Sequence, residues 1–167
     1  LDKAHELIAP LCAGLSACHD AGVLHRNINP SNVLVGKDGA VFRGFGFPPV
    51  IGFARPSVRS ANAGYIAPEV LAGGEATKAS DLYSLAALCY RMVSGRAPAG
   101  AVPPASVRNA ELDPRVDALL AAALHPEPAK RPSLASFREQ LDEIVATPEI
   151  GRAQRLAAEG TTPGQEK

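Results

Sequence analysis

The residue types that could do chemistry are concentrated in one short stretch, HRNINPSNVLV, at residues 25–35. A histidine and an arginine are followed there by three amide side chains, Asn27, Asn29 and Asn32. A second motif, GFG, occupies residues 44–46. A neutral amide cannot accept a proton as a general base, and one amide oxygen is a poor ligand for the hard cation Mg²⁺. The stretch therefore has the density of a catalytic loop but lacks the carboxylates that proton transfer and metal binding need.

The elements that must position this stretch are a helix before it and a hairpin after it. Residues 1–22 carry apolar side chains on one helical stripe, and Gly22 is typical of a helix end. Further along, apolar runs flank KDG at 37–39, and Asp-Gly between such runs is a strong hairpin signal. We therefore predict two short strands, at 33–35 and 41–43.

The second half of the chain is predicted to be helical apart from two connections. Residues 44–64 are rich in Gly, Pro and small polar residues, which indicates a long loop. The run at 80–95 is apolar almost all round and predicts a central, buried helix. After a proline-rich connection over 96–108, Asp113 and Ser133 are the expected N-caps of two further helices.

Composition limits the class of protein. The 167 residues are 46% hydrophobic, enough for one buried core. Seventeen basic and seventeen acidic side chains cancel without forming runs, so nothing favours a nucleic-acid partner or an anionic membrane surface. No apolar run is long enough to span a membrane. The cysteines show no C-x-x-C spacing and fit reduced core thiols: Cys12, Cys18 and Cys89. We expect a cytoplasmic protein, or the cytosolic region of a larger one.

The motifs resemble those of eukaryotic-type serine/threonine protein kinases, in their C-terminal lobe. The catalytic loop of that family reads H-R-D-L-x-x-x-N, and HRNINPSN matches it at His25, Arg26 and Asn32. GFG stands in the place of D-F-G. The resemblance covers residues 1–146 and implies a mainly α, protein-kinase-like C-terminal lobe with a small β-hairpin near the catalytic loop. Residues 147–167 are small and polar and are interpreted as a tail or linker.

Later motifs follow in the order of the family. GYIAPE supplies its A-P-E motif, with Pro68 and Glu69, and HPEPAKRPS resembles its penultimate turn, with Arg131. The resemblance implies a buried ion pair between Glu69 and Arg131. Asp81, at the start of the apolar helix, is expected to accept backbone N–H bonds from the catalytic loop, and a plain helix cap is the alternative.

The departures from the family fall on the chemical positions. The loop aspartate that accepts the proton of the substrate hydroxyl is Asn27 here, and the lysine two residues later is Asn29. The D-F-G aspartate, which binds magnesium in the family, is Gly44. Asn32 alone remains, as a weak metal and cofactor ligand. We therefore expect no intact catalytic residue and no cofactor.

Three matching residues have structural roles in the family. His25 is expected to be a core histidine rather than a catalyst. Phe45 is expected to pack in the interior. Gly46 permits unusual backbone angles.

Arg26 is ambiguous. The family often pairs this arginine with a phosphate on the long loop, and Ser57 and Ser60 are the candidate phosphosites. Because Arg55 and Arg59 adjoin them, a basic docking segment and a merely soluble loop are alternatives.

These observations favour a pseudokinase lobe, a protein-binding or regulatory module in signalling without phosphotransfer. Its partner would be another protein, or a second copy bound through an uncovered apolar face near the hairpin. The first alternative is an atypical Ser/Thr kinase that uses Mg-ATP when its full-length parent supplies an N-terminal lobe. The second is a decayed fragment without function. The opening helix has no preceding cap, so the parent is expected to continue upstream, and a Gly-rich loop there would favour the kinase.

Overall fold

The fold is mainly helical with one small hairpin, as the sequence predicts. The computed structural model describes residues 1–37, 39–45, 62–100 and 102–147. In chain order, the helices and strands are α1 (Asp2–Asp20), β1 (Val33–Gly36), β2 (Gly39–Phe42), α2 (Pro68–Leu71), α3 (Lys78–Ser94), α4 (Pro114–Ala123) and α5 (Leu134–Ala146). Short 3-10 helices lie at Pro30–Asn32, Ala63–Tyr65, Ala105–Val107 and Pro128–Lys130.

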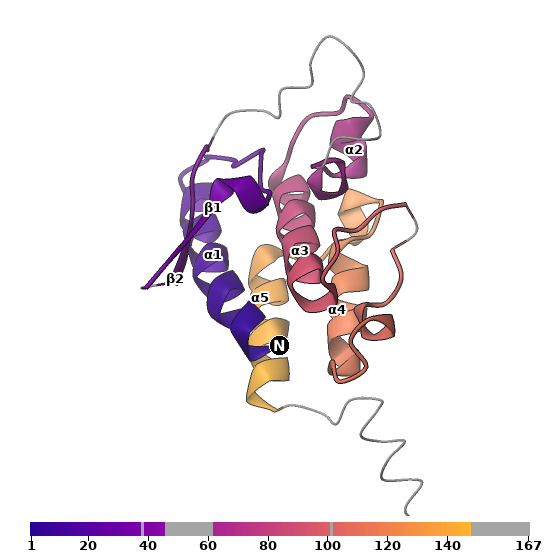
Figure 1. The fold of residues 1–167 in the computed structure, drawn as a ribbon. Helices are drawn as coiled ribbons and strands as arrows, with labels where there is room; N and C mark the ends of the chain where they lie inside the picture. The colour runs from indigo at the N-terminus through magenta and orange to yellow at the C-terminus, as the bar shows by residue number, and fades with distance from the viewer. Residues whose placement is uncertain (38, 46–61, 101, 148–167) are drawn as a thin grey trace, which may run out of the picture.

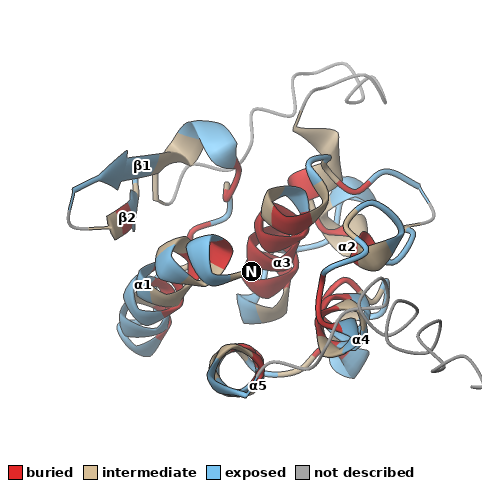
Figure 2. Ribbon diagram, turned by 60° about the horizontal axis from the view of Figure 1, so that its bottom comes forward, coloured by how far each residue is buried: buried red, intermediate tan, exposed pale blue. Residues whose placement is uncertain are grey.

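The central element is α3. Residues 80–90 are buried without a break, which fits an apolar run with no polar face (Figure 2). Thr77 caps the helix, because its side chain accepts the N–H of Ser80 while the Ser80 side chain accepts the N–H of Thr77. Gly95 ends it in the left-handed conformation, at φ 79°. The helix therefore begins two residues before the predicted run.

The other helices surround α3. α1 and α4 pack on it from two sides, and α5 packs against both α1 and α4 (Figure 1). The predicted caps are present, since the Asp113 side chain accepts the N–H of Arg115 and the Ser133 side chain accepts that of Ser136. The inward faces of α4 and α5 are apolar, with these residues buried: Val116, Leu119, Leu120, Ala123, Phe137, Leu141 and Ile144.

The hairpin packs on α1 through β2. β1 and β2 are antiparallel, with Val33 opposite Phe42 and Gly36 opposite Gly39. The predicted second strand, 41–43, was placed too late, because the strand already begins at Gly39, where it pairs with Gly36. Ala40 is buried against α1, so a small side chain permits the close approach of strand and helix.

Some predictions need correction or lie outside the described residues. Cys12 and Cys89 are buried, but Cys18 is only half-buried, so it is not a core thiol. The short helix α2 was not predicted, since four residues are too few to show a period. The roles of Gly46, Ser57 and Ser60, and the tail from 148 onward, lie outside the described residues. Within the described ranges, no helix combines the length and apolarity needed to cross a membrane.

Candidate functional site

Asp81, in the first turn of α3, binds the backbone of the stretch 25–32. The Asp81 carboxylate accepts the backbone N–H groups of His25 and Arg26, each at 2.8 Å. Nε2 of His19, at the end of α1, lies 2.9 Å from the same carboxylate. Arg26 has a φ of 67°, a conformation that most non-glycine residues avoid. Asp81 is therefore not the helix cap, which is Thr77; it holds the loop in a strained backbone conformation.

Sequence reasoning missed His19. This residue is buried at 5% exposure, and it shares the Asp81 carboxylate with the loop. A signal was present, since His19 lies four residues after Leu15 and so continues the apolar stripe of α1. A polar side chain at a buried stripe position needs a hydrogen-bond partner, and Asp81 is that partner.

His25 occupies a core position. Its ring is fully buried between Phe42 and Phe45, with ring centroids 4.8 and 4.3 Å away. Nδ1 accepts the N–H of Asn27 at 3.3 Å, and Nε2 has no hydrogen-bond partner among the described residues. Burial lowers the pKa of the imidazole, which favours the neutral form. A ring enclosed in this way cannot touch a substrate, and Phe45 is one of the walls that enclose it.

The side chains of Asn29 and Asn32 both bond to Asn27. Nδ2 of Asn29 donates to the backbone oxygen of Asn27 at 3.0 Å and to its Oδ1 at 2.9 Å. Nδ2 of Asn32 donates to the same backbone oxygen at 2.8 Å. Oδ1 of Asn29 accepts the N–H of Ser31 at 2.9 Å and so caps the short helix Pro30–Asn32. The side chains of Asn29 and Asn32 thus find partners within the loop, without a charged side chain.

Gly44 and Asn32 lie side by side. A Cβ added at Gly44 would be 3.2 Å from Oδ1 of Asn32, and Gly44 has a φ of 76°. The fold therefore brings together the two positions at which the kinase family holds magnesium. Only one amide oxygen is supplied, whereas Mg²⁺ prefers carboxylates in octahedral geometry. No group of three His, Cys, Asp or Glu side chains in the described ranges could hold a metal ion. The residues present do not fit Mg²⁺.

Glu69 and Arg131 form a two-pronged ion pair that joins α2 to the turn before α5. Nη1 and Nη2 of Arg131 each donate to one Glu69 oxygen at 2.7 Å. The Arg131 side chain is fully buried, and the Glu69 side chain is 20% exposed. Burial raises the pKa of the Glu69 carboxyl, but hydrogen bonds from Arg131 and Ser80 outweigh this and hold the pKa below its usual value. Pro68 opens α2 directly before this pair.

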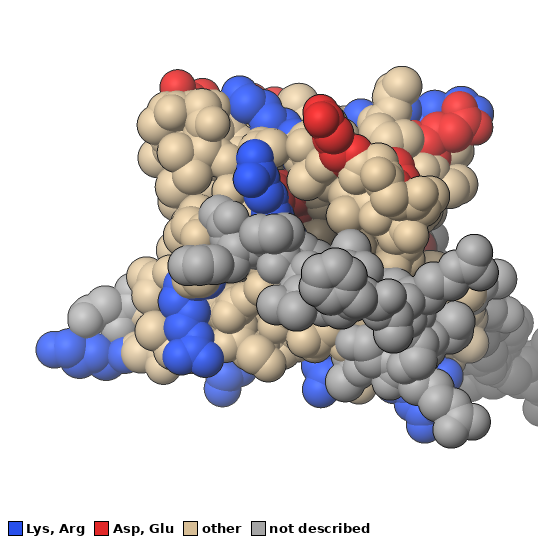
Figure 3. Space-filling model, turned by 90° about the horizontal axis from the view of Figure 1, so that it is seen from above, with Lys and Arg blue, Asp and Glu red and all other residues tan. Residues whose placement is uncertain are grey.

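Arg26 points its side chain to solvent. The side chain is exposed and makes no hydrogen bond or ion pair with the described residues. In the view of Figure 3, Asp and Glu side chains gather toward the upper edge, whereas Lys and Arg occur along both edges. Arg26 forms no ion pair with an Asp or Glu of the described residues.

Comparisons with known proteins agree on one family. A family model described as the protein kinase domain matches residues 1–146. Serine/threonine-protein kinase PknL of Mycobacterium tuberculosis is 30% identical over 166 residues, which cover 86% of this chain and 42% of PknL. PksC of Streptomyces coelicolor is also 30% identical, over 87% of this chain and 30% of PksC. The crystal structure of the M. tuberculosis PknI kinase domain matches with a TM-score of 0.68 and 27% identity, over 85% of this chain and 54% of that domain. The chain spans less than half the length of these curated relatives.

Proposed function

Because this chain belongs to the protein kinase family, we propose that it acts as a pseudokinase, a protein-binding or regulatory module in signalling that does not transfer phosphate. The observation that carries the proposal is the amide network around Asn27. In a kinase, the residue at this position accepts the proton of the substrate hydroxyl. An amide has no basic lone pair for that proton, and Oδ1 of Asn27 already accepts a hydrogen bond from Asn29.

Loss of the metal position supports the same conclusion. Phosphoryl transfer depends on positioning and on positive charge against the phosphoryl oxygens. Gly44 offers no ligand, Asn32 offers one neutral oxygen, and Asn29 replaces the cation of the loop. These losses act on one reaction as a unit, so their effects are not summed.

The retained scaffold supports a binding role. Asp81 still holds the loop backbone, and the Glu69–Arg131 pair still ties α2 to the last helices. Leu34 and Val41 are cross-strand partners on the hairpin and are 49% and 60% exposed. Exposed apolar surface of this kind marks interaction sites. We infer that the fold is used for presentation of surfaces rather than for catalysis.

The test is an assay for transfer of radiolabelled phosphate from ATP, together with a thermal-shift titration of ATP with and without Mg²⁺. The assay uses this chain and any longer natural protein (the longer product) that contains it, because the chain matches only part of a kinase. PknL, the relative named as a serine/threonine-protein kinase, is assayed in parallel for comparison. We expect no turnover above a mock purification and no Mg²⁺-dependent shift in Tm.

The matched variant restores the family residues with Asn27→Asp, Asn29→Lys and Gly44→Asp together. Turnover by the unmodified longer product would contradict the proposal and favour the atypical kinase. Turnover that appears only after the triple substitution would support it, since the missing groups would then be those that the amides and the glycine replace.

A further inference from the structure

A pocket of about 410 Å³ lies between α3 and α4 and opens beneath the proline-rich segment. Tyr83 and Tyr90 of α3, Leu120 and Leu124 of α4, and residues 102–105 supply much of its lining. Ligand sites of proteins fall in this range of volume and are mostly apolar with a few polar groups. The loop at 25–32 contributes no lining residue, so the pocket is separate from the kinase-type site.

Hydrogen bonds hold the outer wall of the pocket in place. The Tyr90 hydroxyl donates to the backbone oxygen of Pro103 at 3.0 Å. The N–H of Ser106 donates to Oδ1 of Asp117 at 3.1 Å. Both bonds join the proline-rich segment to a helix, α3 in the first case and α4 in the second. A preformed cavity binds with a smaller loss of conformational entropy than one that must be built on binding.

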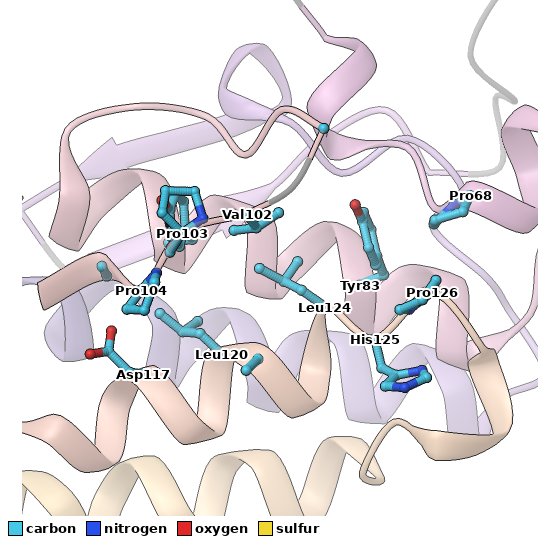
Figure 4. A pocket seen from close by; sticks show the side chains of 14 residues that line it. Pro68, Tyr83, Val102, Pro103, Pro104, Asp117, Leu120, Leu124, His125 and Pro126 are labelled. Carbon is cyan, nitrogen blue, oxygen red and sulfur yellow. Dashed lines mark hydrogen bonds between the residues drawn. The ribbon is translucent and has the colours of Figure 1, made fainter. Parts of the chain in front are cut away.

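The polar groups of the pocket sit at two ends of an apolar middle. Figure 4 shows Leu120, Leu124 and Val102 between Asp117 on one side and Tyr83 on the other. Asp117 is the only Asp, Glu, Lys or Arg among the lining residues that the structure describes. No Lys or Arg of the described ranges pairs with it. A carboxylate at the rim of an apolar cavity favours a ligand that carries a cation.

Tyr83 supplies a polar group at the other end of the pocket, on the same side as His125. Its side chain is more than nine-tenths buried, at 9% exposure, and its ring stacks beneath the Arg131 guanidinium at 5.0 Å. Tyr83 lines the pocket, and its hydroxyl is open to solvent and makes no hydrogen bond to any described residue. Burial raises the pKa of this hydroxyl, so it keeps its proton and remains a donor. A hydroxyl donor in the wall of a pocket favours a ligand that brings an acceptor.

We propose that this pocket binds an extended peptide segment of a partner protein, with a backbone carbonyl at the Tyr83 hydroxyl, an apolar side chain in the middle and a Lys or Arg at Asp117. A peptide offers these three groups in succession, because it carries a carbonyl at every residue and alternating side chains. This proposal rests on the proposed function and makes it more specific, because it gives a protein-binding module a binding site and a class of ligand.

The experiment measures fluorescence anisotropy of labelled peptides titrated with the full chain. Three probes carry Gly-Ser-Leu-Arg-Gly-Ser with zero, one or two glycines between the leucine and the arginine. Matched probes replace the arginine by glutamate or the leucine by serine. We expect at least one Leu/Arg probe to bind with a Kd below about 1 mM, and its matched probes to bind about tenfold more weakly or not at all.

Substitutions in the pocket locate the binding. Ala121→Arg should weaken binding at least about tenfold, because it lies one helical turn after Asp117 and places a cation and bulk in the cavity. Asp117→Asn keeps an acceptor for Ser106 and should weaken binding about three- to fivefold. Tyr83→Phe keeps the ring beneath Arg131 and should weaken it about threefold. Ala13→Arg, at an exposed position of α1, is the control and should leave peptide binding unchanged.

Several results would contradict the proposal that the pocket binds a peptide. They are the absence of binding by all three probes, equal binding of the glutamate probe, or binding that Ala121→Arg leaves intact. A dimer in sedimentation that Ala121→Arg dissolves would assign the pocket to a second copy of the chain instead. Phosphate transfer is measured separately. A chain that transfers phosphate and also binds these peptides would refute the proposed function but support the peptide-binding pocket.

Discussion

At the scale of single residues, the buried histidine His25 shows how a residue can be kept while its chemistry is not used. Its ring lies between Phe42 and Phe45, and Nε2 has no hydrogen-bond partner among the described residues. A proton on this ring would place a charge between two aromatic rings, and the cost of that burial outweighs the attraction of the Asp81 carboxylate and lowers the pKa.

This burial predicts a dependence of stability on pH. The unfolded histidine titrates near 6.5 and the folded one at lower pH, so the unfolded state binds more protons between the two values. The free energy of unfolding contributed by His25 is therefore present above about pH 6.5 and is lost as the pH falls below it. Urea midpoints measured from pH 8 to 5.5 should decline, and the decline should be smaller in His25→Phe. An equal decline in both proteins would contradict the account.

Gly44 predicts a cost for restoring the family residue. At a φ of 76°, with Oδ1 of Asn32 3.2 Å from the added Cβ, Gly44→Ala should destabilise the chain by about 1–2 kcal/mol. Gly44→Asp should cost at least as much, because it also places a carboxylate beside that amide oxygen. Gly14→Ala is the matched control: it lies inside α1 with open space at its Cβ and should stabilise by about 0.5–1 kcal/mol. Urea unfolding measures the stability of each variant. A Gly44→Ala variant as stable as the unmodified chain would contradict the strain at this position.

At the scale of elements, the Glu69–Arg131 pair connects parts that lie far apart in the sequence. Arg131 also donates to the backbone oxygens of His125 and Ala79, at 2.8 and 3.0 Å. One guanidinium therefore joins α2, the start of α3 and the turn before α5. Its removal takes away the cation paired with Glu69, which keeps the hydrogen bond from Ser80, and the side-chain donor to several carbonyls.

Arg131→Ala should therefore lower the free energy of unfolding by about 3–5 kcal/mol, the cost of leaving one member of a buried pair alone. Glu69→Gln should lower the free energy of unfolding by less. Its amide oxygen still accepts a hydrogen bond from Arg131, and the bonds from Arg131 to the backbone oxygens of His125 and Ala79 remain. Equilibrium urea unfolding measures both. Lys130→Ala, next in sequence but exposed and paired only with Glu127, is the control and should change little. An unchanged midpoint for Arg131→Ala would show that the pair does not hold the fold.

The sequence shows the long elements and their caps, and it misses what depends on contacts. Helical periods reveal α1, α3, α4 and α5, since each extends over several turns. α2 is too short to show a period, and the start of β2 depends on pairing with Gly36 rather than on its own residues. In the site, motif positions identify Asp81 and its loop. They do not reveal that Asn29 and Asn32 bond to Asn27, because that network depends on backbone geometry that only the fold supplies.

At the scale of the whole molecule, charge and apolar surface are distributed differently. The formal charges cancel over the chain, so long-range attraction gives no partner preference. Among the described residues, three of the six exposed large apolar side chains lie on the hairpin, where Leu34, Val35 and Val41 are 49%, 63% and 60% exposed. A two-stranded sheet also leaves backbone groups open at its edges, which favours pairing with another chain.

We therefore expect this chain to self-associate through the hairpin when no other partner covers it. Analytical sedimentation should show a mass that rises with concentration, and the double substitution Leu34→Thr/Val41→Thr should return the chain to a monomer. Threonine keeps the strand preference of these positions, so the loss would come from the apolar surface and not from unfolding. Val107→Thr is the matched control, because Val107 is 72% exposed but lies away from the hairpin in the segment before α4. A chain that sediments as a monomer at all concentrations, or whose association survives the double substitution, would show that the exposed hairpin face does not bind a second copy.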